Sequence, residues 1–375
     1  MDTKQGLEGV VAATTRLSSV DGEAGVLLIA GFPVEDLAPL ATFEETTWLL
    51  WNGALPGAAD LAAFRSRLAA RRALPAATLD LLRAAAQRRV PVMDALRMAS
   101  GTLSLTDSAG DTGQDAVILV AAFPAIVAAY WRMLEGKEPL APREDLGHTA
   151  SFLYLLTGEE PAAERVRGLE TYLNTVIDHG FNASTFTARV IISTRSDLVS
   201  AVTGAVGALK GPLHGGAPGP ALDMVFEIGT ADRAEPVLRE KLARGERLMG
   251  FGHRIYRVRD PRADVLAEAA ARFYKNAGDS ALYDLARSVE ATALRLLREH
   301  KPDRPLDTNV EFYTALLLHG LGLPTDLFTP LFAVGRVSGW IAHCLEQLAN
   351  GRLIRPQSEY VGERDRRWVP VEERR

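Results

Sequence analysis

The sequence has 375 residues, of which 47% are hydrophobic and 24% are charged, and its formal net charge is −5. This length is enough for a large core and for more than one domain, and the composition is that of a globular protein. A net negative charge argues against nucleic acid as the main partner, because a protein that follows a phosphate backbone needs a dominant basic surface.

The cysteine count and the start of the sequence limit the chemistry and the compartment. Cys344 is the one cysteine, so neither an internal disulfide nor a cysteine-based metal site is expected. The histidines form no metal-binding motif, and we expect no metal. The first ten residues contain neither a basic nor an apolar signal region, which favours a cytoplasmic protein.

The elements can be predicted in chain order. Residues 25–29 (G-V-L-L-I) give the clearest strand signal. The most apolar run, residues 116–131, is short for a membrane span of about 20 residues and contains Pro124, so we expect a kinked core helix and no membrane partner. From residue 33 onward, helical spacing predicts an all-α fold with a short N-terminal β element and a polar, irregular tail from residue 352. The expected helices span residues 43–51, 58–73, 75–88, 90–102, 116–134, 148–157, 161–175, 222–247, 264–276, 282–300, 311–321 and 331–350.

Two glycine-rich breaks interrupt the helices, and each contains a histidine. His214 lies in residues 210–220 (K-G-P-L-H-G-G-A-P-G-P), where a side chain between helices can face a cleft. His253 lies in residues 248–262 (L-M-G-F-G-H-R-I-Y-R-V-R-D-P-R), where two glycines allow a tight turn ahead of a cationic segment. A helix-capping loop histidine is the alternative for His214, and a solvated basic face is the alternative for the second break.

Four further residues are candidates for the same site. Arg336 lies in an apolar helix (A-V-G-R-V-S-G-W), where its charge is unfavourable unless it meets an anion, and its small neighbours leave room for one. The other three have structural alternatives: a satisfied buried histidine for His179, a helix-start carboxylate for Glu311 and a surface arginine for Arg355. Two histidines and one carboxylate are what proton abstraction beside a carbonyl needs, and arginines would hold a small polycarboxylate.

Motifs along nearly the whole chain, in order and with compatible spacings, resemble those of the citrate synthase family. The resemblance is specific because several long motifs agree together. They are G-L-E-G-V-V-A and V-D-G-E-x-G near the N-terminus, D-H-x-F-N-A-S-T-F-T-A-R at 178–189, G-P-L-H-G-G at 211–216, G-F-G-H-R-I-Y at 250–256, D-P-R at 260–262, N-V-x-F-Y at 309–313 and R-P-x-x-E-Y-V-G at 355–362.

The resemblance implies an all-α homodimer with the active site between two domains of each subunit. The large domain would comprise residues 1–215 and 322–375, and the small domain residues 216–321. Transferred by motif, His214 would bind the acetyl-CoA thioester carbonyl and stabilise the enol. His253 would polarise the oxaloacetate carbonyl, and Glu311 would be the general base.

The resemblance also implies how the ligands are held. Oxaloacetate carboxylates would bind to His179, Arg262 and Arg336, and Arg355 would reach across to the site of the partner subunit. Coenzyme A would enter as the acyl-carrying co-substrate, with no permanently bound cofactor. Its phosphate would meet Arg257, and its adenine would lie near the loop of Gly250, Phe251 and Gly252.

The chain departs from the family pattern at three places around this site. The family's general base is an aspartate in N-V-D-F-Y, whereas this chain has Glu311, which is one methylene longer. Moving a catalytic group by about 1 Å can lower a rate about 100-fold. Gly180 stands where the family usually has glutamate, and Pro218 and Gly219 stand where it usually has Asn-Glu.

The predicted function is therefore the condensation of acetyl-CoA with oxaloacetate to citrate and coenzyme A by a citrate synthase-type acyltransferase. One alternative is a 2-methylcitrate synthase-like activity on propionyl-CoA. Another is a weakly active or non-catalytic relative that binds coenzyme A or a dicarboxylate. A purely structural helical scaffold is the third.

Overall fold

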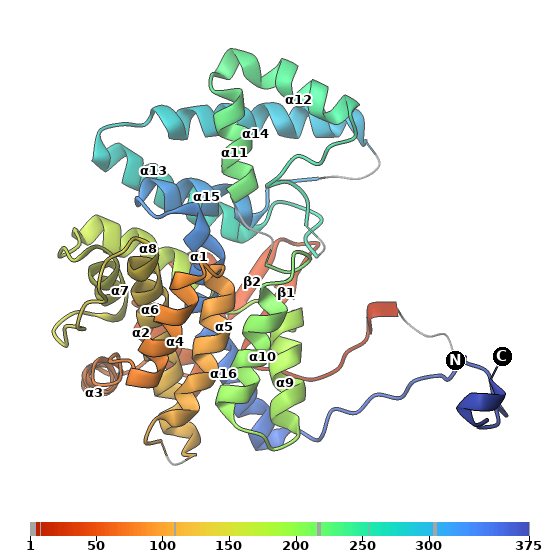
Figure 1. Ribbon diagram of the computed structural model, residues 1–375. Helices are drawn as coiled ribbons and strands as arrows, with labels where there is room; N and C mark the ends of the chain where they lie inside the picture. The colour runs from red at the N-terminus through yellow and green to blue at the C-terminus, as the bar shows by residue number, and fades with distance from the viewer. Residues whose placement is uncertain are drawn as a thin grey trace.

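The computed structural model describes residues 5–7, 9–108, 110–215, 219–253, 255–302 and 306–374. A three-stranded antiparallel sheet near the N-terminus is followed by helices, as Figure 1 shows. The strands are β1 (Ser18–Asp21), β2 (Val26–Ile29) and β3 (Phe32–Pro33). The predicted strand at 25–29 is confirmed as β2, whereas the short β1 and β3 were not predicted.

Most helices form a body in the lower part of Figure 1. They are α1 (Val34–Leu37), α2 (Phe43–Asn52), α3 (Ala58–Ala69), α4 (Ala76–Gln87), α5 (Val92–Thr102), α6 (Thr112–Leu134), α7 (His148–Thr157), α8 (Ala163–Val176), α9 (Ala183–Ser193), α10 (Leu198–Leu209) and α16 (Phe328–Asn350). After α16 the chain is irregular and exposed, as predicted for the polar tail, and Figure 1 shows it leading away from the body.

A second group of helices lies together in the upper part of Figure 1. It consists of α11 (Gly219–Ile228), α12 (Ala234–Ala243), α13 (Pro261–Ala277), α14 (Ala281–His300) and α15 (Val310–Gly320). Helix α13 packs on α15 within this group and on α8 and α1 of the body. This contact brings the start of α13 and α15 against the end of α8, where the candidate site residues gather.

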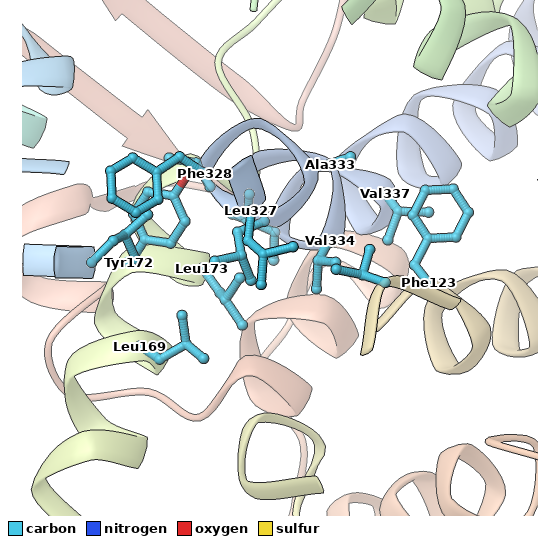
Figure 2. Close-up of a cluster of buried hydrophobic side chains, with 14 of the residues drawn as sticks. Phe123, Leu169, Tyr172, Leu173, Leu327, Phe328, Ala333, Val334 and Val337 are labelled. Carbon is cyan, nitrogen blue, oxygen red and sulfur yellow. The ribbon is translucent and has the colours of Figure 1, made fainter. Parts of the chain in front are cut away.

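The core of the body forms around α6 and α16. Figure 2 shows Phe123 of α6, Leu173 of α8, and Phe328, Val334 and Val337 of α16 in one apolar cluster, and all five side chains are buried. Burying one such side chain stabilises the fold by roughly 1.5–3 kcal/mol. Helix α6 is long and apolar enough to cross a membrane, yet 78% of its most apolar window is buried inside the protein, so it is the core helix that the sequence predicts.

Two parts of the helix prediction differ from the structure. The single helix expected at 222–247 is two helices, α11 and α12, because Gly229 adopts a φ of 73° and ends α11. Helices α9 and α10 lie where no element was predicted. Gly204 lets them approach closely, since a Cβ at this position would lie 2.3 Å from the Cδ1 atom of Ile191.

Candidate active site

The loop that carries His253 is held against the start of α15 by backbone pairing. The Gly252 N–H donates to the Asp307 carbonyl at 2.7 Å, and the Asn309 N–H donates to the Gly250 carbonyl at 2.9 Å. Phe251 forms a β-bridge with Thr308. Both glycines have positive φ values of 87° and 82°, a conformation that glycine adopts without steric penalty.

The same pairing also explains why the loop needs glycine. A Cβ at Gly250 would lie 2.9 Å from the Cβ of Phe312, and a Cβ at Gly252 would lie 3.0 Å from Leu306. Asn309 caps α15 by accepting from the Glu311 N–H at 2.9 Å, and its own amide donates to the Gly252 carbonyl at 2.9 Å. His253 and Glu311 are therefore placed by one hydrogen-bonded unit.

His253 is held in one neutral form. Its Nδ1 accepts from the backbone N–H groups of Ile255 and Tyr256 at 3.1 and 3.2 Å. Burial, assisted by the nearby Arg262 charge, lowers the pKa of His253 to about 4. Because Nδ1 is an acceptor, we assign the ring proton to Nε2, which makes this atom a hydrogen-bond donor. Nε2 lies 3.4 Å from the Arg262 Nη2 atom.

His179 and Tyr256 form the neighbouring part of the site. The His179 Nε2 atom lies 3.1 Å from the Tyr256 hydroxyl, and its ring stands edge-on to His253 with centroids 5.7 Å apart. Burial and the positive charges of Arg262 and Arg336 lower the pKa of His179 well below its usual value. His179 is therefore a neutral polar group that faces two arginines.

His214 contacts the start of α9. Its Nε2 atom lies 2.7 Å from the Ser184 hydroxyl and also accepts from the Ser184 N–H at 3.3 Å. Since Nε2 accepts from the N–H, we assign the proton to Nδ1, which leaves Nδ1 as a donor. Burial and then the Arg336 charge lower the pKa of His214 to about 4. Ser184 is itself fixed by Trp340, whose Nε1 donates to the hydroxyl at 3.0 Å.

The two arginines of the site differ in pairing. Arg262 forms a two-pronged ion pair with Asp260, with Nε–Oδ1 and Nη2–Oδ2 distances of 3.0 and 2.8 Å. Arg336 is 1% exposed and has no ion-pair partner among the described residues. Its Nε donates to the Val176 carbonyl at 2.5 Å, while its buried Nη2 has no acceptor there. Burial lowers the pKa of Arg336 to about 10, which still leaves the guanidinium charged at neutral pH.

The glycines beside Arg336 have a different role from the one predicted. A Cβ at Gly335 would lie 2.8 Å from Val176, and a Cβ at Gly339 would lie 2.2 Å from the Ile177 carbonyl oxygen. These glycines let α16 approach the end of α8, so the prediction that they leave room for an anion is wrong. The close approach is what brings Arg336 against the Val176 carbonyl.

Glu311 contributes a largely buried carboxyl group to the candidate site. Its carboxyl group lies in the first turn of α15 and has no hydrogen-bond partner among the described residues. Burial raises the pKa of Glu311 to about 7, and the positive charge of Arg262 partly opposes this shift. A base is most effective when its pKa lies near the working pH.

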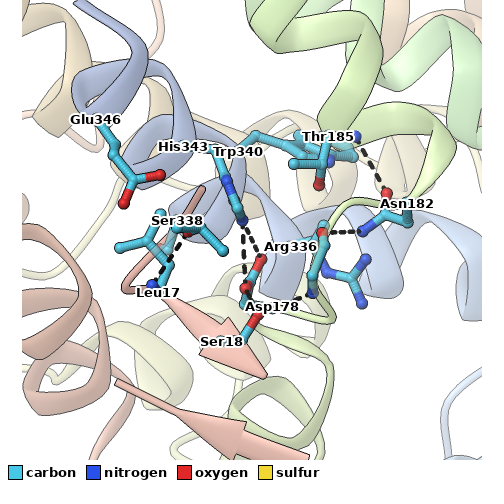
Figure 3. Close-up of polar contacts among 12 residues, drawn as sticks. Leu17, Ser18, Asp178, Asn182, Thr185, Arg336, Ser338, Trp340, His343 and Glu346 are labelled. Atoms are coloured by element: carbon cyan, nitrogen blue, oxygen red, sulfur yellow. Dashed lines mark hydrogen bonds and ion pairs between the residues drawn. The ribbon is translucent and has the colours of Figure 1, made fainter. Parts of the chain in front are cut away.

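A separate polar network, the supporting network, adjoins the site, and Figure 3 shows its members Ser18, Asp178, His343 and Glu346. Asp178 is fully buried, accepts from the Ser18 hydroxyl and contacts the His343 Nε2 at 3.2 Å. The other ring nitrogen of His343 lies 3.1 Å from Arg189, which pairs with Glu346 at 2.7 Å. Burial alone would raise the pKa of Asp178, but contacts with His343 and nearby positive charge lower it, so Asp178 is ionised. It precedes His179, and the Ser18 hydroxyl that donates to Asp178 also accepts from the Gly180 N–H at 2.8 Å.

The structure thus brings six predicted residues into contact or within reach of one another's charge. They form the candidate cluster, which is defined as His179, His214, His253, Arg262, Glu311 and Arg336. Four supporting residues were not predicted as functional: Asp178, Ser184, Tyr256 and Trp340. Three of these lie inside or beside the quoted motifs, so proximity in sequence to a candidate histidine was the available signal.

The remaining predicted residues lie outside this cluster in the single chain. Arg257 and Arg355 are exposed, and the Arg257 N–H donates to the Gly22 carbonyl at 2.8 Å. Gly180 has a φ of 60°, Gly219 begins α11, and Pro218 lies outside the described residues. Within the described ranges, no group of three or more His, Cys, Asp or Glu side chains is arranged to hold a metal ion.

Comparison with known proteins identifies the family. The sequence model described as "Citrate synthase, C-terminal domain" matches residues 6–357. Citrate synthase 2 of Bacillus subtilis is 43% identical over all of both chains, and 2-methylcitrate synthase of Shewanella oneidensis is 40% identical, with 99% and 98% of the two chains covered.

Solved structures agree with this assignment. Citrate synthase of Thermotoga maritima superposes with a TM-score of 0.86 at 40% identity, covering 99% of each chain. The Thermoplasma acidophilum enzyme, in a ternary complex with carboxymethyl coenzyme A and oxaloacetate, gives 0.88 at 30% identity, covering 98% of each. The chain belongs to the citrate synthase family. The predicted all-α fold and the predicted class, a citrate synthase-type transferase, are therefore confirmed.

Proposed function

We propose that the protein condenses acetyl-CoA with oxaloacetate at the candidate cluster and releases citrate and coenzyme A. Glu311 takes a proton from the acetyl methyl group, and the Nδ1–H of His214 stabilises the negative charge that develops on the thioester oxygen. The resulting enol carbon attacks the oxaloacetate carbonyl carbon. The Nε2–H of His253 stabilises the oxygen that gains charge there, and water then hydrolyses the citryl thioester.

The observation that carries this proposal is the state of Arg336. A buried guanidinium without a counter-ion is unfavourable, so its free Nη2 calls for an anionic ligand. The ligand faces three neutral histidines, whose pKa values are all lowered by burial. Neutral histidines donate hydrogen bonds without repelling the arginines. Oxaloacetate, a small dicarboxylate with a carbonyl group between its two carboxylates, fits this set of groups.

We further propose how coenzyme A and a second subunit complete the site. Arg257 is exposed and free to meet a phosphate, and the loop of Gly250, Phe251 and Gly252 borders the same segment. Arg355 lies in the exposed tail beyond α16, so it is available to a neighbouring molecule. We therefore propose a homodimer in which Arg355 completes the site of the partner subunit.

Domain organisation and location complete the proposal. We propose that residues 216–321 form a small domain that closes over oxaloacetate on a large domain of residues 1–215 and 322–375. The acyl-CoA is a co-substrate, no cofactor is permanently bound, and the enzyme works in the cytoplasm.

The test is coenzyme A release, measured as free thiol, with oxaloacetate and either acetyl-CoA or propionyl-CoA. Wild type is expected to turn over acetyl-CoA, and Glu311→Gln to lose about 1,000-fold in rate because the base is removed. Glu311→Asp is the matched control that keeps a carboxylate.

Each other outcome points to a different function. Preference for propionyl-CoA would replace the proposal with a 2-methylcitrate synthase-type activity, which the Shewanella oneidensis relative makes a specific competitor. No release by wild type, together with release by Glu311→Asp, would identify a binding protein whose base is misplaced.

A further inference from the structure

One buried carboxylate that the proposed mechanism does not use is surrounded by hydrogen-bond donors. Glu290 of α14 is 3% exposed. Its Oε1 accepts from the Arg259 Nη1 at 2.6 Å and from the Thr308 hydroxyl at 2.7 Å. Its Oε2 accepts from the Tyr313 hydroxyl at 2.5 Å and from the Arg287 Nη1 at 3.0 Å. Burial alone would raise the pKa of Glu290, but these donors lower it, so the carboxylate is ionised.

Glu290 holds the chain on both sides of Glu311. Thr308 precedes Glu311 and Tyr313 follows it, and both of these side chains are buried. Tyr313 belongs to α15, so its hydrogen bond ties the first turn of this helix to α14. The Glu311 carboxyl itself has no hydrogen-bond partner among the described residues. Its position therefore depends on how the backbone around it is anchored.

Thr308 also connects Glu290 to the loop that carries His253. Thr308 is 1% exposed, forms the β-bridge with Phe251, and its carbonyl accepts from the Asp260 N–H at 3.2 Å. Its hydroxyl is the group that reaches Glu290. A single side chain thus links the Glu290 carboxylate to both backbone contacts, and a change at Glu290 is felt in this loop as well as in α15.

We propose that Glu290 is a positioning residue that sets the distance between the Glu311 carboxyl and the acetyl methyl group. This inference rests on the proposed function, in which Glu311 is the general base. The charge of Glu290 gathers donors from the loop, from α15 and from α14, and so fixes these elements before substrate binds. The effect on rate is large because a shift of about 1 Å in a catalytic group can cost about 100-fold.

Glu290→Gln tests this role at almost constant size, because the amide NH₂ group of glutamine cannot accept hydrogen bonds. The kcat of coenzyme A release is expected to fall about 10- to 100-fold. The KM for oxaloacetate should stay within a few-fold, since Arg262 and Arg336 keep their own contacts. Glu235→Gln is the matched control with unchanged kcat, because half-exposed Glu235 also pairs with two arginines, one of them on α14. An unchanged kcat in Glu290→Gln overturns the proposal.

Thr308→Val keeps the test decisive if Glu290→Gln fails to fold. This variant removes the hydroxyl that reaches Glu290 and keeps the backbone contacts of Thr308. Its kcat is expected to fall about tenfold, and Thr308→Ser, which retains a hydroxyl, should stay within about twofold of wild type. An unchanged kcat in Thr308→Val overturns the proposal as well.

A readout that does not need turnover separates this inference from the proposed function. The pKa of the Glu311 carboxyl is followed by carbon NMR of the full chain, with Glu311→Gln to assign the signal. Glu290→Gln loosens the start of α15 and admits water, so this pKa is expected to fall from about 7 toward its usual 4.5. An unchanged pKa overturns the positioning role, whether or not wild type is active. A lowered pKa in a protein that releases no coenzyme A contradicts the proposed function and leaves the anchoring of Glu311 by Glu290 in place.

Discussion

Two buried polar clusters meet at the peptide that joins Asp178 to His179, and they differ in how far they are satisfied. In the supporting network, Asp178, His343, Arg189 and Glu346 pair with one another. The candidate cluster, in contrast, contains Arg336 without a counter-ion and Glu311 without a donor among the described residues. Both clusters contain fully buried charged residues, such as Asp178 in the first and Arg336 in the second, so burial alone does not tell them apart.

The difference shows that pairing, more than burial, separates a supporting network from a binding site. A fully paired buried cluster holds the backbone, and the loss of one partner leaves an isolated charge. An unpaired cluster carries unfavourable free energy until a ligand supplies the missing groups. Replacing a paired arginine in one cluster and an unpaired arginine in the other tests this distinction.

The largest effect is expected from His253→Ala. The variant removes the Nε2–H that we assign to the developing oxygen charge, and loss of one such donor costs about 1,000-fold in turnover. Coenzyme A release under saturating substrates measures it, with His253→Gln as a control that retains a donor. Unchanged turnover in His253→Ala would exclude the role assigned to this residue.

Arg189→Met is expected to lower the free energy of unfolding by about 3 kcal/mol, because it leaves the Glu346 charge half-buried and unpaired beside His343. Chemical denaturation measures the loss. Turnover at a temperature where the variant is folded should remain within a few-fold of wild type. A stable variant with strongly reduced turnover would show that the supporting network takes part in substrate binding.

Arg336→Met is expected to show the opposite pattern. The catalytic efficiency for oxaloacetate should fall about 100-fold, since a charge-assisted contact to a carboxylate is lost. The free energy of unfolding should stay the same or rise, because an unpaired buried cation is replaced by an apolar side chain of similar length. If Arg336→Met is destabilised as much as Arg189→Met, the distinction between the two clusters fails.

A smaller effect is expected from pH. Glu311 must be ionised to act as a base, so catalytic efficiency should rise about tenfold per pH unit up to an apparent pKa of about 7. His214 and His253, with pKa values of about 4, stay neutral throughout this range. A catalytic efficiency that stays constant between about pH 5.5 and about pH 7.5, on either side of that pKa, would contradict the assignment of Glu311 as the general base.

Stability should change in the reverse direction over the same range. The pKa of Glu311 in the folded protein, about 7, lies above its usual 4.5, so the folded state binds more protons between these values. The contribution of Glu311 to stability is therefore complete below pH 4.5 and is lost as the pH rises through 7. Comparison of wild type with Glu311→Gln isolates it from Glu170, whose pKa burial also raises to about 7.

The sequence allowed the fold and most of the candidate cluster to be predicted, for identifiable reasons. Helical spacing located most helices to within a few residues, and the glycines around His253 marked a turn that the structure contains. The supporting network was not predicted because its members are far apart along the chain. Asp178 and His343, for example, are separated by 165 positions, and neither periodicity nor local motifs report such a contact.

Pairing was the other property that the sequence did not contain. Arg262 and Arg336 carry the same side chain, and only the fold shows that the first is held by Asp260 while the second has no carboxylate partner among the described residues. Helix α10 was missed for a related reason, because Gly204 weakens a helix in isolation and is favourable only through its contact with α9.

The pairing between residues 250–252 and 307–309 has a consequence for how the active site can diverge. It fixes the spacing between His253 and Glu311 through backbone pairing that is completed by Gly250, Gly252 and the Asn309 side chain. The groups that face them, His214 and Arg336, come from other elements. Substitutions on that opposite side can therefore change which ligands bind while the distance between His253 and Glu311 stays constant. Substrate choice can thus evolve independently of the bond-forming geometry.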